Sequence, residues 1–320
     1  MKPKILIIGA KGQLGIVLTR YLQDRYGRDR VIAADIQNEP IDNCLYHQID
    51  AMDYKGLQQI ILRYKITQIY HMAAILSAKG EQNPMNAWDI NMKTWLNVLE
   101  VSRKEGVKKI FYPSSIAVFG GNYDKVNTAN GVFLSPTTVY GVSKAAGENW
   151  ANYYHHKYNL DIRSLRYPGV LSYQSTPGGG TTDYAVDIFH KAVTEGIYNC
   201  YLSANVTLPM IFIDDAIKAT VILMEAPVHC VKNRTSYNLA GISFSPEELV
   251  AKIRNYIPDF KVTYNPDYRE KIALEWPRSI DDTTAQSDWG WQSEYNLDGI
   301  VEIMIKQLKK RYENPIFTDS

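Results

Sequence analysis

Short apolar runs alternate with stretches of helical spacing along the first 115 residues. The runs occupy residues 5–8, 31–35, 44–50, 68–73 and 109–115. Several are nearly continuous in Ile, Leu, Val or Tyr, which is typical of strands covered on both faces. Between the runs, apolar residues recur at helical spacing, as at Leu14, Leu18 and Leu22. This alternation predicts a doubly wound parallel α/β sheet.

The pattern changes after about residue 172. A helix at 143–158 and a strand at 161–170 precede a glycine-rich break at 175–182, which needs special backbone angles. The elements predicted beyond it are helices at 184–196 and 214–225, a helix opened by Ser245, a terminal helix from Leu297, and strands at 200–202, 210–213, 236–239 and 261–264. We therefore predict a large sheet domain over residues 1–172, with some return segments from the C-terminal half. Residues 173–320 would form a smaller α/β substrate-binding region over the carboxyl edge of the sheet.

Charge and composition exclude several classes of protein. The formal net charge is +1, so the chain lacks the field of one sign that nucleic-acid binding uses. No apolar run approaches the ~18 residues of a membrane span, and no secretory signal precedes the first strand. Three cysteines without metal or redox spacing suit a reducing compartment, and the six histidines show no ligand spacing. We expect a cytoplasmic protein without a metal, a membrane partner or a nucleic-acid partner.

A glycine-rich loop follows the first strand and opens a helix. Gly9, Gly12 and Gly15 would allow a tight turn, and the helix N-terminus would face the charge of a pyrophosphate. Three glycines could also mark a plain structural turn, but Asp35 closes the second strand, where a carboxylate accepts ribose hydroxyls. The loop therefore predicts a Rossmann fold that binds NAD. Lys11 within the loop leaves some use of NADP open.

The spacing Gly-x-x-Gly-x-x-Gly resembles that of the extended short-chain dehydrogenase/reductase family. Asp50, at the end of the third strand, matches the acid beside the adenine in that family, although it is also consistent with a strand-end cap. The segment from His71 to Ala74 matches the strand end that lines the cofactor, and Asn91 matches a structural asparagine.

Tyr140 and Lys144 form a Tyr-x-x-x-Lys motif, which places a phenol and an ammonium on one helix face. A nearby cation favours the phenolate, which could then act as a base. In a chain with 23 tyrosines this spacing is a common coincidence. Ser115, at the end of the fifth strand, completes a match to the catalytic triad of the same family and is preferred by spacing to Ser114. We therefore expect hydride transfer to NAD, with Tyr140, Lys144 and Ser115 as catalytic residues.

The full set of predicted cofactor-binding residues combines the loop with the family match. It comprises Gly9, Gly12, Gln13, Leu14, Gly15, Asp35, Asp50, Ala51, Met72, Ala73, Ala74, Asn91, Tyr140, Lys144, Tyr167 and Pro168.

The substrate region departs from the pattern of nucleotide-sugar enzymes, which hold a second pyrophosphate with arginine. Residues 208–215 carry apolar residues where such an arginine is expected. The loop that ends at Asp183 offers backbone N–H groups, hydroxyls and one carboxylate, a set that suits a small zwitterion. A nucleotide-sugar 4-epimerase or dehydratase is the alternative enzyme, and a catalytically silent NAD-binding protein is a third possibility.

Segments 114–120, 172–189 and 276–291 are similar to those of the short-chain L-threonine 3-dehydrogenases. The resemblance implies oxidation of the Cβ hydroxyl of L-threonine to 2-amino-3-oxobutyrate, in threonine catabolism towards glycine and coupled to an aminoketobutyrate:CoA ligase. It also implies a homodimer through helices at 84–105 and 143–158, and closure of the glycine-rich loop over the substrate. The implied substrate-binding residues are Ser77, Ser115, Tyr140, Gly180, Thr181, Thr182, Asp183 and Trp276. Trp276 is equally consistent with a core position, and residues 178–180 with a plain hinge.

Overall fold

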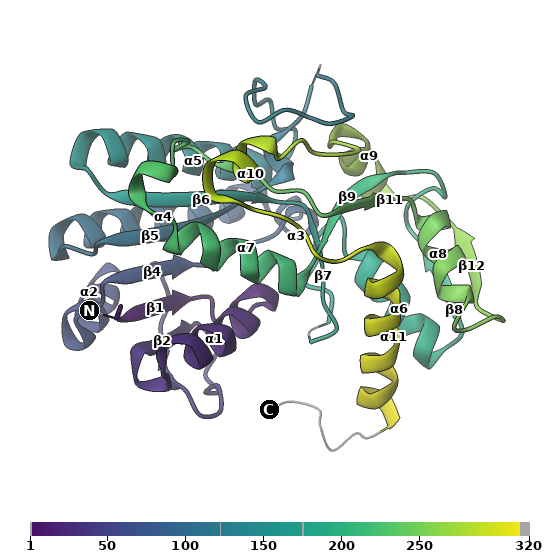
Figure 1. The fold of residues 1–320 in the computed structure, drawn as a ribbon, viewed down its shortest axis with the longest axis horizontal. Coiled ribbons are helices and arrows are strands. Elements are labelled where there is room, and N and C mark those ends of the chain that lie inside the picture. The colour runs from purple at the N-terminus through teal and green to yellow at the C-terminus, as the bar shows by residue number, and fades with distance from the viewer. Residues whose placement is uncertain (1, 122, 175, 314–320) are drawn as a thin grey trace.

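A seven-stranded sheet forms the larger part of the computed structural model, which describes residues 2–121, 123–174 and 176–313 (Figure 1). All neighbouring strands in this sheet are parallel, in the order β10-β6-β5-β4-β1-β2-β3. Their bounds are β1 Ile5–Ile8, β2 Val31–Asp35, β3 Leu45–Gln48, β4 Gln68–His71, β5 Lys109–Ser115, β6 Asp161–Tyr167 and β10 Tyr237–Asn238. The chain moves outward from β1 in one direction and then restarts at β4 on the other side. The carboxyl ends of β1 and β4 therefore flank the switch point where ligands bind in such sheets.

Two separate apolar cores cover the two faces of the sheet. Ile5 and Ile7 of β1 belong to the core on one face, and Leu6 and Ile8 to the core on the other. The first core includes residues of α1 (Gln13–Tyr26) and α7 (Ile213–Glu225), and the second includes residues of α2 (Tyr54–Tyr64), α4 (Pro84–Glu105) and α5 (Val139–Tyr158). This burial on both faces explains why the strands read as continuous apolar runs and confirms the predicted doubly wound sheet.

The predicted strand at 161–170 is wrong in one respect, because it is two strands in different sheets. β6 ends at Tyr167, and β7 (Gly169–Leu171) pairs with β9 (Leu208–Phe212) in a three-stranded sheet completed by β11 (Ile242–Phe244). Pro168 separates them, and proline has no N–H to donate to a sheet ladder. The chain therefore leaves the main sheet beside its carboxyl edge.

The second half of the chain builds a smaller group of elements, at the right of Figure 1. It contains β8 (Ile197–Cys200) paired with β12 (Lys261–Tyr264), together with the helices α6 (Tyr184–Thr194), α8 (Pro246–Arg254), α9 (Tyr268–Glu275) and α11 (Leu297–Glu313). The short helix α10 (Thr283–Trp289) instead lies beside β10. The predicted start of α8 is confirmed, because Ser245 and Glu248 form a reciprocal capping box. The strand expected at 200–202 lies earlier, at β8, and β11, α9 and α10 were not predicted.

Two segments of the second half return to the main sheet. β10 pairs with β6, and α7 packs beside α1. They are return segments of the kind expected from the sequence, while the division at residue 172 stays a prediction. Residue 175, where the expected glycine-rich break begins, lies outside the described residues. Among the helices that the structure describes, none is long and apolar enough to cross a membrane.

Candidate active site

The glycine loop between β1 and α1 is fixed by close backbone contacts. Gly9 has φ of +81°, and a Cβ at this position would lie 2.5 Å from Ala73 N. A Cβ at Gly15 would lie 2.2 Å from Gly9 O. Both positions therefore exclude a side chain, as the predicted tight turn requires. No described side chain caps Gly12, so the first N–H groups of α1 are open to an anion.

Asp35 is buried at the end of β2, and its carboxylate already accepts backbone hydrogen bonds. Lys11 N donates to Oδ2 at 2.9 Å, and Gln37 N donates to Oδ1 at 3.2 Å. The Lys11 ammonium contacts Glu39, at 3.1 Å to the carbonyl oxygen and 3.2 Å to the carboxylate. From the sequence alone, the positive charge of Lys11 left some use of NADP open. In the structure this charge has an acidic partner, Glu39.

Two of the predicted cofactor residues have local partners. Asp50 Oδ1 accepts a hydrogen bond from Met52 N at 2.8 Å, which is the strand-end turn considered as its alternative role. Asn91 accepts from Ile75 N at 2.8 Å and donates to Ile75 O at 3.1 Å and to Ser143 Oγ at 3.2 Å. The Asn91 amide therefore fastens the segment after β4 to helix α5.

A cavity of about 140 Å³ opens at the carboxyl ends of the central strands. It brings together fifteen of the predicted residues, namely Gln13, Leu14, Met72, Ala74, Ser77, Ser115, Tyr140, Lys144, Tyr167, Pro168, Gly180, Thr181, Thr182, Asp183 and Trp276. The predicted residues that do not line it are Gly9, Gly12, Gly15, Asp35, Asp50, Ala51, Ala73 and Asn91. Sequence reasoning missed Leu76, Pro113, Ser114, Ile116, Gly169 and Val170, all of which are chain neighbours of residues that it named.

Helix α5 carries Tyr140 and Lys144 into this cavity. Its N-cap is Thr138, whose side chain accepts from Gly141 N at 3.1 Å. The Lys144 ammonium donates to Pro113 O at 2.6 Å and lies 5.5 Å from the centre of the Tyr140 ring. Ser115 accepts from Ala117 N at 3.2 Å and so holds the turn that follows β5. The structure therefore places the three predicted catalytic residues at one site.

The protonation of this pair differs from the expectation. Burial raises the pKa of Tyr140 to about 12, and a hydrogen bond with Ser115 only partly opposes this effect. Burial lowers the pKa of Lys144 to about 7, while the Glu148 carboxylate acts in the opposite direction. Without a ligand, desolvation outweighs the attraction between phenolate and ammonium that the sequence suggested.

The substrate side of the cavity is held by a second glycine-rich loop. Ser77 Oγ accepts from Thr181 N at 3.2 Å and lies 3.1 Å from Thr181 Oγ1. Asp183 Oδ2 accepts from Gly179 N and from Gly180 N, each at 2.8 Å. The sequence predicted that backbone N–H groups of this loop would suit a substrate carboxylate. In the structure, the N–H groups of Gly179 and Gly180 donate to Asp183 instead.

Trp276 lines the same cavity. The residue is 4% exposed, and its indole Nε1 has no hydrogen-bond partner among the described residues. A buried indole N–H without a partner is costly, so this donor is suited to a ligand in the cavity. The position is thus both buried, as the alternative reading had it, and part of the cavity wall.

The segment where nucleotide-sugar enzymes carry an arginine has a structural role here. Strand β9 is buried throughout, and the Asp215 carboxylate accepts from Glu294 N at 3.0 Å and from Tyr295 N at 3.2 Å. Among the described residues, no group of His, Cys, Asp and Glu is arranged to hold a metal ion.

Comparisons with known proteins agree with this arrangement. Residues 5–240 match the model of the NAD dependent epimerase/dehydratase family. The mitochondrial L-threonine 3-dehydrogenase of Bos taurus is 42% identical over 94% of this chain and 82% of its own length. An uncharacterized epimerase/dehydratase of Staphylococcus saprophyticus is 41% identical over 96% of this chain and 97% of its own.

Solved structures show the same likeness. The holo form of a GalE-like L-threonine dehydrogenase from Cupriavidus necator superposes with a TM-score of 0.94. It is 48% identical, and the match covers 96% of this chain and 100% of that one. The chain therefore belongs to the NAD-dependent epimerase/dehydratase family, alongside relatives that are L-threonine 3-dehydrogenases.

Proposed function

We propose that this protein oxidises the Cβ hydroxyl of L-threonine with NAD, giving 2-amino-3-oxobutyrate, NADH and a proton. The observation that carries the proposal is a small cavity with Ser115, Tyr140 and Lys144 on one wall and the Asp183 loop with Trp276 on the other. Strand β9 carries no arginine for the second pyrophosphate of a nucleotide sugar, and the Asp183 loop offers a carboxylate and hydroxyls, so a free amino acid suits this site better than a nucleotide sugar.

The residues of the β1–α1 region fit the pyrophosphate and adenosine ribose of NAD. The open N-terminus of α1 is suited to the phosphates, and the close packing at Gly9 and Gly15 keeps side chains out of their path. Asp35 is placed to accept ribose hydroxyls, and the Lys11–Glu39 contact leaves less positive charge for a 2′-phosphate. When bound, NAD supplies the acceptor for the hydride that leaves Cβ.

Proton transfer is assigned to the three residues on the catalytic wall. Tyr140, as phenolate, takes the hydroxyl proton, and Ser115 donates a hydrogen bond to the oxygen as it becomes a carbonyl. Because burial raises the pKa of Tyr140, a cation beside it is needed to favour the phenolate near neutral pH. Lys144 supplies this charge from its position on the same helix face. It would also hold the nicotinamide ribose when NAD is bound.

The opposite wall would bind the zwitterionic part of threonine. Asp183 suits the ammonium, and the hydroxyls of Ser77, Thr181 and Thr182, together with the Trp276 indole, provide donors for the carboxylate. Gly180 supports this wall through its N–H, which donates to the Asp183 carboxylate. Movement of the 178–183 loop would close the cavity and exclude water during hydride transfer. Hydrogen exchange should then show more protection of this loop with NAD and L-threonine than without them, and equal protection would contradict closure.

The direct test is absorbance in the NADH band with NAD and L-threonine, D-threonine or UDP-sugars. We expect NADH only with L-threonine, and a loss of about 10²–10⁴-fold in kcat for Tyr140→Phe, which is the contribution of general acid–base catalysis. Tyr21→Phe is the control, because Tyr21 is exposed on α1 and does not line the cavity. Turnover of UDP-sugars alone, or full activity of Tyr140→Phe, would overturn the proposal.

The oligomer is part of the same proposal. Trp150, Tyr153 and Tyr158 are each more than a third exposed on α5 and lie among mutual ring contacts on its surface. Exposed aromatic residues on a helix face suit a subunit interface, here a homodimer through α4 and α5. Trp150→Glu should shift the mass measured by light scattering to that of a monomer. Tyr21→Glu, at an equally exposed aromatic position on α1, should not.

Two expectations about cellular context remain proposals. The cytoplasmic location rests on cysteine usage alone and is tested by cell fractionation. Functional coupling to an aminoketobutyrate:CoA ligase follows from the proposed product, and glycine formation from threonine, CoA and both purified proteins tests it.

A further inference from the structure

A buried ion pair lies directly behind the catalytic wall. Glu148 is on α5, one helical turn after Lys144, and Arg166 is on β6, next to Tyr167. Their side chains are 1% and 4% exposed, and the guanidinium binds the carboxylate through two parallel contacts, from Nε to Oε1 at 2.9 Å and from Nη2 to Oε2 at 2.8 Å. This bidentate contact fixes the orientation of the Glu148 carboxylate.

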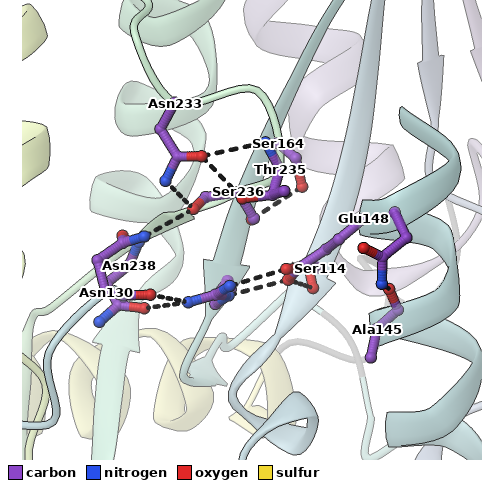
Figure 2. Close-up of polar contacts among 11 residues, drawn as sticks. Ser114, Asn130, Ala145, Glu148, Ser164, Asn233, Thr235, Ser236 and Asn238 are labelled. Carbon is purple, nitrogen blue, oxygen red and sulfur yellow. Dashed lines mark hydrogen bonds and ion pairs between the residues drawn. The ribbon is translucent and has the colours of Figure 1, made fainter. Parts of the chain in front are cut away.

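Further hydrogen bonds join the pair to the end of β5 on one side and to Asn238 of β10 on the other. On the catalytic side, Ser114 Oγ donates to Glu148 Oε1 at 2.6 Å, and Ser114 is the chain neighbour of Ser115. On the other side, Arg166 Nη1 donates to Asn238 Oδ1 at 3.2 Å, and Asn238 Nδ2 donates to Asp281 O at 3.0 Å. Figure 2 shows Glu148 beside Ser114, with Asn130 and Asn238 on the far side of the network.

Several ionisable groups surround Lys144, and they differ in what they do to its charge. They are Tyr140 and Glu148 on α5, Tyr112 on β5 and His71 on β4. His71 is buried with its pKa lowered to about 3, so it is neutral. Tyr112 is buried with its pKa raised, so it is neutral as well. Glu148 is the group in this set whose charge favours the ammonium.

We propose that Glu148 is a positioning residue, which Arg166 fixes so that it aligns Ser114 and keeps Lys144 charged beside Tyr140. The proposal deepens the dehydrogenase function and rests on it. Burial lowers the pKa of Lys144 to about 7, and the Glu148 carboxylate counteracts this effect. The fraction of Lys144 that is protonated at neutral pH therefore depends on how strongly the Glu148 carboxylate offsets the desolvation of the ammonium.

A second ion pair on the same strand, between buried Arg163 and partly exposed Asp161, provides a control of similar geometry. Arg163 binds Asp161 through two contacts of the same geometry, from Nε to Oδ1 at 3.0 Å and from Nη2 to Oδ2 at 2.8 Å. It lies at the other end of β6, and Arg163 Nη1 also donates to Ala226 O. A variant of this pair loses a charge without touching the cavity.

The experiment compares Glu148→Gln with Asp161→Asn in pH profiles of kcat and of NAD affinity, the latter measured by tryptophan fluorescence. Activity needs Lys144 charged and Tyr140 ionised, so we expect the alkaline limb of kcat to move down by about one pH unit in Glu148→Gln. The pH above which NAD affinity falls should move with it, since a neutral amine donates fewer hydrogen bonds. Asp161→Asn should leave both positions unchanged, whatever it does to stability.

Glu148→Gln leaves the buried Arg166 without a counter-charge, a change that can prevent folding. The double variant Glu148→Gln/Arg166→Met removes both charges and should fold with the same shifted limb. If the folded variants keep the wild-type position of the alkaline limb of kcat, Glu148 does not have the proposed role. An equal shift of that limb in Asp161→Asn would overturn the role as well. Absence of NADH production by the wild-type protein would instead reject the dehydrogenase function, while the NAD affinity profile would still test Glu148.

Discussion

The two glycine-rich loops at the cavity look alike in sequence but owe their glycines to different physical causes. In the loop that opens α1, the backbone itself excludes a side chain, because a Cβ at Gly9 or Gly15 would lie 2.5 Å or less from other backbone atoms. In the loop before Asp183, a Cβ at Gly178 or Gly179 would meet only side-chain atoms, at 3.4 Å. The first loop is a rigid part of the fold.

The second loop is held by one carboxylate. Asp183 Oδ2 takes the N–H groups of Gly179 and Gly180, and Lys79 N donates to Gly179 O at 3.2 Å. A segment that depends on few hydrogen bonds opens at lower free energy than one packed on all sides. The difference teaches that glycine spacing alone does not separate a rigid phosphate loop from a movable substrate loop.

The largest effect should come from the rigid loop. Gly9→Ala combines an unfavourable positive φ with a backbone clash, so the free energy of unfolding without ligand should fall by about 2–3 kcal/mol. Gly12→Ala is the control, because its Cβ would lie 3.4 Å from Gly9 O and φ is −69°. Urea unfolding measures both, and equal stability of the two variants would remove the distinction.

Asp183→Asn should have the next largest effect. Loss of the carboxylate weakens both the loop contacts and the proposed contact with the substrate ammonium, so KM for L-threonine should rise about 10- to 100-fold. NAD affinity should stay within about twofold, since the α1 loop is untouched. Asp187→Asn, one turn along α6, is the control that should leave KM unchanged. An unchanged KM in Asp183→Asn would place substrate binding elsewhere.

The same carboxylate predicts a pH dependence in the wild-type protein. Burial raises the pKa of Asp183, and hydrogen bonds from the glycine loop oppose this only in part. Asp183 therefore becomes neutral at a higher pH than an ordinary aspartate, and KM for L-threonine should rise severalfold as the pH falls through that raised pKa. Initial rates across the acidic range measure it. The same rise in Asp183→Asn would assign it to another group.

Gly178→Ala should have the smallest effect. Its φ is not positive, and the nearest atom to a new Cβ is the flexible Leu76 Cδ1, so kcat/KM should change by less than about twofold. Gly179→Ala, at φ of +96°, should cost more. Steady-state kinetics on the pair would sharpen the comparison, and a severe loss in Gly178→Ala would show that the second loop is as constrained as the first.

The sequence predicted the cofactor half better than the capping half. Strand β5 lies at the predicted residues 109–115, and Tyr140, Lys144 and Ser115 meet at one cavity, because buried parallel strands give continuous apolar runs. Helix α9 was missed because Ala273 is its one buried residue, which leaves no apolar stripe to detect. The break at Pro168 was missed because β7 begins only one residue after it, so the two strands look like one continuous run.

The polar network behind the site could not be predicted from the sequence, for a different reason. Glu148 and Arg166 come from different elements, and Asn238 lies still further along the chain. No local pattern encodes their meeting, since it follows from the tertiary pairing of β10 with β6.

That late pairing also determines how the protein folds as it leaves the ribosome. Until residue 238 has emerged, β6 is an uncovered edge, and until α7 has emerged, α1 lacks its neighbour. Exposed edges and apolar faces on a nascent chain recruit chaperones or aggregate. The nucleotide-binding half therefore cannot become self-sufficient until about residue 238 has been made, although most of its residues are made much earlier.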